Sequence, residues 1–159
     1  MTNALMPAAF IGHGSPMNTL EHNRYTEAWR AFGASVPTPR AIVVVSAHWY
    51  INAAAVTAMA RPRTIHDFYG FPDALYAMDY PAPGNPTLAR DVVSLLASHH
   101  AAEDDTWGLD HGAWTVLRFL YPQAKVPVFQ VSIDMGRGLE HQLEVGRTDV
   151  AGADRRLRE

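Results

Sequence analysis

Residues 41–49 read Ala41-Ile42-Val43-Val44-Val45-Ser46-Ala47-His48-Trp49. The first part of this stretch is β-branched and lacks polar alternation, which is typical of a strand buried on both faces of a sheet. A second apolar run, Ala8-Ala9-Phe10-Ile11, stops at Gly12 and predicts another inner strand. Between the two, residues 25–32 place aromatic side chains on one helical face. The predicted order is therefore strand, helix, strand.

The rest of the chain continues this alternation. Further strands are predicted at residues 54–59 and 126–133, and further helices at 87–97 and 111–121, the last one capped by Asp110. Strands that alternate with helices predict a layered α/β/α domain with a mostly parallel central sheet. Ligands of such sheets usually bind beyond the carboxyl ends of the strands.

Composition narrows the classes of function. The chain has 159 residues, a formal net charge of -3, 48% hydrophobic and 18% charged residues, so one folded domain with a sizeable core is expected. Its basic residues are scattered, and we expect no nucleic-acid partner. The longest apolar run is far below the ~20 residues of a membrane span, and no basic segment precedes it, so a cytoplasmic protein without membrane attachment is expected. Cysteine is absent, which leaves His, Asp and Glu as metal ligands.

Two histidines follow the two predicted inner strands. His13 lies in Gly12-His13-Gly14-Ser15-Pro16, where the flanking glycines let the backbone bend sharply, and His48 ends the second strand. Because parallel strands end at the same edge of a sheet, these imidazoles can converge on one ion. The structural alternative is that each is a hydrogen-bonded loop histidine.

Two more histidines lie in short polar clusters. His111, at a helix N-terminus, is expected to stay neutral and to exchange a hydrogen bond with a bound anion or oxygen, or else simply to start the helix. His66 and Asp67 are typical of a turn pair at the surface. The other four histidines lie in polar, helix-like stretches and are expected to face solvent: His22, His99, His100 and His141.

Several aromatic residues surround these histidines in the sequence. They would suit a flat aromatic ligand, although core packing explains them equally well: Trp107, Trp114, Phe68, Tyr69 and Phe71. No Walker loop, dinucleotide fingerprint, Gly-x-Ser-x-Gly elbow or His-Glu-x-x-His helix occurs in the sequence. Phosphate, nicotinamide, serine-esterase and zincin chemistry therefore lack support.

Five motifs, in order, carry a family resemblance. They are Gly12-His13-Gly14-Ser15-Pro16-Met17, Val43-Val44-Val45-Ser46-Ala47-His48-Trp49, Ile65-His66-Asp67-Phe68, Tyr80-Pro81-Ala82-Pro83-Gly84 and Asp110-His111-Gly112. From about residue 7 to residue 147, the chain resembles the 4,5-DOPA extradiol dioxygenase family of class III, LigB-like ring-cleaving enzymes. Members of that family open the ring of a catechol with dioxygen at a non-haem metal.

The resemblance implies a role for each candidate residue. His13 and His48 would be the metal ligands, His111 the catalytic histidine, and His66 and Ser15 part of the substrate pocket. The implied cofactor is Fe(II), with Zn(II) as another ion that the site would accept. The implied partners are a small aromatic diol resembling DOPA, and dioxygen.

The chain also departs from the family pattern. The family continues with an Asn-x-x-His-Asn segment that carries a catalytic histidine and, later, a third histidine ligand, and neither occurs here. Residues 1–147 therefore resemble the N-terminal portion of a LigB-like domain, followed by a divergent charged tail at 148–159. Asp110 and Asp134 are the candidates for a replacement third ligand, although helix capping explains Asp110 better. Ring cleavage by this chain is expected to be impaired.

Two other interpretations stay open at this stage. One is a non-catalytic fragment, either a gene remnant or a module that binds metal and forms oligomers. The other is a zinc hydrolase that uses the same histidine pair, a third N/O ligand and a carboxylate base, which Asp67 could supply. A sheet edge left uncovered predicts self-association, so a homo-oligomer is expected.

Overall fold

The structure is a computed structural model that describes residues 6–156. It contains four strands: β1 (Ile42–Ile51), β2 (Ala55–Thr57), β3 (Ala102–Asp104) and β4 (Val128–Asp134). The helices of the described residues are α1 (Arg24–Ser35), α2 (Asp73–Tyr76), α3 (Pro86–Leu95), α4 (His111–Leu120) and α5 (Leu139–Arg156), with 3-10 turns η1 (Pro16–Leu20) and η2 (Ala97–His99). None of these helices has the length and apolar character that crossing a membrane requires.

The four strands form one sheet in the order β1-β4-β2-β3. β1 runs parallel to β4, with Ile42 opposite Val128, and β2 runs parallel to β3. β2 and β4 are antiparallel and pair at Val56 and Val131. The sheet is therefore mixed but mostly parallel, which confirms the predicted α/β class.

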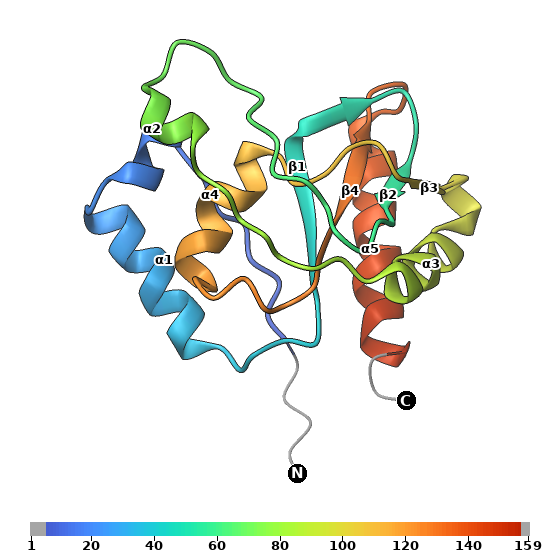
Figure 1. Cartoon of the computed structure of the whole chain (residues 1–159). Helices are drawn as coiled ribbons and strands as arrows, with labels where there is room; N and C mark the ends of the chain where they lie inside the picture. Colours follow the sequence, from blue (N-terminus) through green and yellow to red (C-terminus); the bar gives the residue numbers. More distant parts are fainter. Residues whose placement is uncertain (1–5, 157–159) are drawn as a thin grey trace.

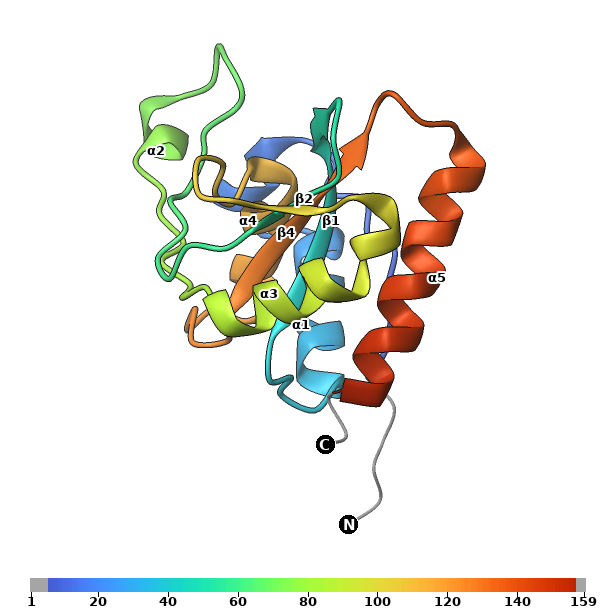
Figure 2. The ribbon, with the colours of Figure 1, turned by 90° about the vertical axis from the view of Figure 1, so that its right-hand side faces the viewer.

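Helices cover both faces of the sheet. α1 and α4 lie on one side and α3 and α5 on the other, as Figure 1 shows and Figure 2 confirms from the side. Because neighbouring residues of a strand point to opposite faces, Val128 belongs to the core beneath α4, whereas Phe129 belongs to the core beneath α3. The two cores hold the sheet between two helical layers, as predicted.

Local signals account for the helix boundaries. Asn23 caps α1 in a reciprocal capping box with Thr26, and Asn85 caps α3. The Asp110 side chain caps α4 by accepting a hydrogen bond from the backbone of Ala113, as the sequence predicts. The backbone of α5 runs through residues 147 and 148 as one helix, so the boundary of a separate tail stays a prediction.

Two strand predictions are wrong. Residues 8–11 form no strand, and the side chain of Phe10 is fully exposed, at 103%. A strand needs a partner for its backbone hydrogen bonds, and no strand of the described sheet pairs with this run. β1 does form, but it is an edge strand with only one face well covered. Ile42 and Val44 pack on the core beneath α4, whereas Val45 is 59% exposed.

Candidate metal centre

Three histidines from distant parts of the chain meet beside the N-terminus of α4. His13 precedes η1, His48 lies in β1 and His111 is the first residue of α4. Each offers a ring nitrogen, and these nitrogens all lie within 4.8 Å of one another. The Nε2 atoms of His13 and His48 are 2.9 Å apart. The expected convergence of His13 and His48 is confirmed, and His111 joins them.

His48 reaches the cluster through an irregularity in β1. The pairing of β1 with β4 shifts register between Val45 and Tyr50. Within that interval, the backbone N–H of His48 donates to Ser46 Oγ at 3.2 Å. A bulge of this kind re-aims a side chain without ending the strand. His48 is therefore inside β1 and not at the strand end where the sequence predicted it.

His13 is positioned by a tight turn instead of by a strand. Gly14 has a φ of +62°, in the left-handed region that favours glycine. Asn18 Nδ2 donates to the carbonyl oxygen of His13 at 3.1 Å and closes the turn. Gly12 has no positive φ and open space around its Cα, so only one of the two flanking glycines is needed for the bend.

His111 is held by a buried carboxyl network centred on Asp110. Asp110 is fully buried, and its Oδ1 accepts hydrogen bonds from Ser46 Oγ at 2.7 Å and from the Ala113 backbone at 3.2 Å. Its Oδ2 accepts a hydrogen bond from Gln130 Nε2 at 2.7 Å. The network joins α4 to β1 and β4, and so fixes the place where His111 enters the cluster.

Neither candidate carboxylate ligand belongs to the histidine cluster. Both oxygens of Asp110 are already engaged, Oδ1 by the helix cap and Ser46 and Oδ2 by Gln130, and Asp134 Oδ1 accepts the backbone N–H of Gly136 at 2.9 Å. Within the described residues, the cluster consists of imidazoles alone.

Gly112 allows the close approach of α4 to β1. A Cβ atom at this position would lie 2.7 Å from His48 Cδ2 and 2.8 Å from Ser46 Oγ. Both distances are shorter than van der Waals contact, so a side chain here would displace His48. The Asp110-His111-Gly112 motif thus combines a helix cap, a cluster residue and a gap for the neighbouring imidazole.

Asp67 lies beside the histidine cluster, and its carboxylate contacts two of the three histidines. Its Oδ1 lies 3.0 Å from His111 Nδ1 and accepts the His111 backbone N–H at 2.9 Å, while its Oδ2 lies 3.7 Å from His48 Nδ1. The contact with His111 Nδ1 is close but not well aligned as a hydrogen bond. The prediction of a surface turn pair is wrong for Asp67, since its side chain is only 20% exposed.

The electrostatics of the cluster favour a negative Asp67 and a neutral His13. Burial alone would raise the pKa of the Asp67 carboxyl, but the close His111 side chain and the hydrogen bond from the His111 backbone N–H outweigh it, and the pKa is lowered. Burial, followed by the neighbouring His111 and His48, lowers the pKa of His13. His13 Nδ1 is also buried without a hydrogen-bond partner in the described part of the chain. A neutral imidazole is the form that binds a metal ion.

His66 and Ser15 lie outside the cluster. His66 Nε2 contacts the carbonyl oxygen of Met78 at 2.8 Å, and its ring packs edge-on against Phe68 and Trp114. Ser15 is exposed and caps η1 by accepting the Met17 backbone N–H at 3.2 Å. Their role in substrate binding stays a prediction.

The aromatic residues divide between core and surface. Trp114 and Phe68 are buried in the core beneath α4, and the ring of Phe68 lies 5.6 Å from that of His111. Trp107 stacks on Trp49 with centroids 5.8 Å apart, and Tyr69 is 93% exposed. Phe68 is thus the buried aromatic residue that links the core to the histidine cluster.

Known proteins match most of this chain in sequence. Residues 7–148 match the family described as the catalytic LigB subunit of aromatic ring-opening dioxygenase. The chain belongs to the LigB family. It is 53% identical over 148 residues to the 4,5-DOPA dioxygenase extradiol of Escherichia coli K12, covering 92% of this chain and 55% of that protein. The corresponding Beta vulgaris protein is 39% identical over 145 residues, covering 87% of this chain and 54% of that protein.

A solved structure supports the same assignment. The crystal structure of an uncharacterized protein from Escherichia coli K12 superposes with a TM-score of 0.69 at 44% sequence identity, covering 84% of this LigB chain and 50% of that chain. The LigB chain described here spans about half the length of the curated relatives it matches.

The donor set fits the non-haem metal of the LigB family. Two imidazole nitrogens that each lie ~2.0 to 2.1 Å from one ion, at a right angle, would be about 3.0 Å apart. The observed separation of His13 Nε2 and His48 Nε2 is 2.9 Å. This spacing fits a pair of ligands to a single ion, and in the metal-free structure it is also the length of a hydrogen bond between the two imidazoles.

Proposed function

We propose that this chain carries the metal-binding half of an extradiol dioxygenase that opens the ring of a DOPA-like catechol with dioxygen. The observation that carries the proposal is the 2.9 Å approach of His13 and His48 in a chain of the LigB family. Fe(II) is the cofactor expected for activity, and Zn(II) is a second ion that the imidazole pair would accept. When bound, Fe(II) would supply the site where the diol and dioxygen are activated.

His13 and His48 would hold the metal. The low pKa of His13 keeps its imidazole neutral, so that no proton has to leave before the ion binds. The contact between His48 Nδ1 and Asp67 at 3.7 Å favours the tautomer that leaves His48 Nε2 free to face His13. The pair would thus present two lone pairs to one ion.

His111 would handle the proton of a catechol hydroxyl. Its Nδ1 faces Asp67, which orients the ring and leaves Nε2 for the substrate side. A positioned acid or base of this kind typically contributes ~10²- to 10⁴-fold in rate.

Ser15 and His66 would contribute to the substrate pocket. Ser15 is exposed at the start of η1, close in sequence to His13, and so is available to a polar group of the substrate. His66 packs beside Phe68, whose ring adjoins His111, and the pair would border an aromatic ring bound at the metal.

The 159-residue chain alone is expected to turn over slowly. The resemblance places a third histidine ligand and a catalytic base in the part of the relatives that this chain does not span. Two protein ligands hold Fe(II) less firmly than the three of a facial triad. We therefore expect binding of metal and catechol by this chain, with weak ring cleavage.

A zinc hydrolase is the second candidate, because Asp67 provides a carboxylate next to the histidines. The two candidates predict different products. The chain is loaded anaerobically with Fe(II) or with Zn(II), then given L-DOPA or an aryl ester. The dioxygenase proposal predicts slow, Fe(II)-dependent dioxygen uptake with a yellow semialdehyde product. Ester hydrolysis without dioxygen uptake would support the hydrolase instead, and catechol that fails to bind the metal-loaded chain would contradict the dioxygenase.

The variant His111→Gln tests whether His111 is a catalytic residue or a metal ligand. We expect this variant to keep its metal and to lose the remaining ring cleavage. His22→Gln is the matched control, since His22 is an exposed histidine outside the cluster, and it should behave like the unmodified chain. If His111→Gln loses metal as completely as His48→Ala, then His111 is a third ligand and not the catalytic group.

A further inference from the structure

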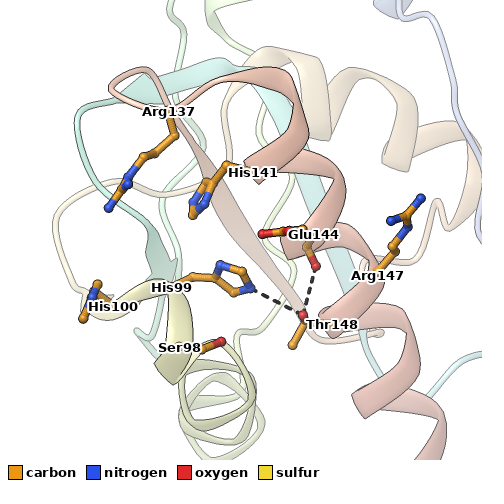
Figure 3. Close-up of a pocket in the computed structure, with 8 residues that line it drawn as sticks. All are labelled: Ser98, His99, His100, Arg137, His141, Glu144, Arg147 and Thr148. Atoms are coloured by element: carbon orange, nitrogen blue, oxygen red, sulfur yellow. Dashed lines mark hydrogen bonds between the residues drawn. The ribbon is translucent and has the colours of Figure 1, made fainter.

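A pocket lies on the opposite side of the sheet from the histidine cluster. It opens between η2 and α5 and has a volume of about 490 Å³. Figure 3 shows its lining, which is dominated by basic and hydroxyl side chains: Ser98, His99, His100, Arg137, His141, Glu144, Arg147 and Thr148. Sites for small molecules typically have volumes of ~300 to 1,000 Å³, so the pocket has the size of a ligand site.

Two histidines that the sequence assigned to solvent meet inside this pocket. His99 and His141 are both partly buried, with ring centroids 5.0 Å apart at 80°. His99 Nε2 lies 3.4 Å from Thr148 Oγ1. His141 Nε2 is buried and has no hydrogen-bond partner among the described residues. A buried ring nitrogen without a partner is unfavourable, and a turn of the imidazole toward a ligand in the pocket would satisfy it.

Arginine side chains add positive charge to the pocket. No ion pair joins Arg137 or Arg147 to a carboxylate of the described side chains. Arg137 is exposed in the connection between β4 and α5. Figure 3 shows that the Arg147 guanidinium extends away from the two imidazoles, which leaves Arg137 as the cation nearer to the histidine side of the pocket.

The lining favours an anion over a metal ion. The pocket offers N–H and O–H donors from two arginines, three histidines, a serine and a threonine, against one carboxylate, Glu144. His99, His141 and Glu144 do not form a close donor group like that of His13, His48 and His111 within the described residues. Arginine forms paired hydrogen bonds with phosphate and carboxylate groups, which a cation could not use.

We propose that this pocket binds a small organic anion through a phosphate or carboxylate group. Arg137 supplies the charge and the imidazole of His141 supplies a hydrogen bond to the anionic oxygens. The pocket lies on the α3 and α5 side of the sheet, so its ligand is distinct from the catechol proposed for the metal centre. Its occupancy does not depend on the metal.

The test is a titration of the full 159-residue chain, with isotope-labelled histidine side chains observed by NMR. Inorganic phosphate and citrate are the two probes, added separately at an ionic strength held constant with chloride. We expect at least one of them to give saturable shifts of His99 and His141, with His13 and His48 unaffected. Phosphate alone would indicate a phosphate ligand, and citrate alone a carboxylate ligand.

Matched arginine variants complete the test. Arg137→Gln should weaken binding by at least ~10-fold, because a charge-assisted hydrogen-bond pair is lost. Arg61→Gln removes an exposed arginine outside the pocket and should leave the affinity unchanged. Backbone NMR spectra check that both variants are folded. No saturable shift with either anion, or equal weakening by both variants, would overturn the proposal.

Discussion

Replacing Asp110 by alanine should destabilise the fold more than any surface substitution, because this carboxyl accepts hydrogen bonds from four donors, the weakest being Trp107 Nε1 at 3.4 Å. It caps α4 through Ala113, and it accepts hydrogen bonds from Ser46 Oγ and Gln130 Nε2. Asp110 is fully buried, and Ser46 and Gln130 are buried as well, so water cannot easily replace the lost acceptor.

The magnitude follows from these contacts. Loss of a helix N-cap typically costs about 1 kcal/mol. Each buried donor left without an acceptor costs ~1 to 3 kcal/mol, and Asp110→Ala leaves two such donors, on Ser46 and Gln130. Allowing for partial relaxation, the free energy of unfolding should fall by ~3 to 5 kcal/mol, a large share of the ~5 to 15 kcal/mol of a typical domain.

Urea denaturation followed by tryptophan fluorescence measures this change. Asp105→Ala is the matched control, since Asp105 is an exposed aspartate in the same loop and its loss should change the free energy of unfolding little. The slope against urea should be the same for all three proteins. A loss below about 1 kcal/mol for Asp110→Ala, similar to the control, would refute the view that the buried network fixes α4 against β1.

Four further predictions concern the site and the exposed strand. Gly112→Ala should weaken metal binding by ~10-fold, measured by competition with a chelator, because a Cβ would push His48 aside. The control Gly138→Ala should leave metal binding unchanged, because open space surrounds Gly138. The pKa of His13 is lowered from 6.5 in the folded chain, so as the pH falls the unfolded chain binds a proton at His13 before the folded chain does. The metal-free fold should therefore lose stability as the pH falls below 6.5. In denaturation measured as a function of pH, His13→Gln should reduce that loss. With Fe(II) and L-DOPA, the 159-residue chain should cleave the ring far more slowly than ~1 s⁻¹, and an oxygen-electrode rate above that value would show that this half suffices. Light scattering should show self-association through the edge strand that carries exposed Val45, reduced by Val45→Lys; a monodisperse monomer at high concentration would contradict it.

Local sequence signals predicted the parts of the fold that depend on neighbours in the chain. α4 was predictable because Asp110 precedes an apolar helical pattern, and β1 because its β-branched run suits a strand. The run at residues 8–11 has the same apolar character and forms no strand, since strand formation also needs an available partner edge. The exposure of Val45 could not be predicted either, because it depends on which helices cover an edge strand.

The candidate site was predictable only in part. The motifs that flank His13, His48 and His111 indicated these residues, and the structure brings them together. The position of Asp67 against His111 had no local signal, because the contact spans 44 residues and depends on how the loop before α2 folds over α4. The meeting of His99 and His141 was missed for the same reason, since polar helical stretches give no sign of a partner on another element.

Metal content tests the central claim most directly. The purified chain is stripped with a chelator, reloaded anaerobically with Fe(II) or Zn(II), passed through a desalting column and analysed for metal by elemental analysis. If His13 and His48 hold one ion, the unmodified chain and His22→Ala should retain about one equivalent, and His48→Ala should lose most of it. Equal metal content in His48→Ala and the unmodified chain would contradict the assignment of the centre.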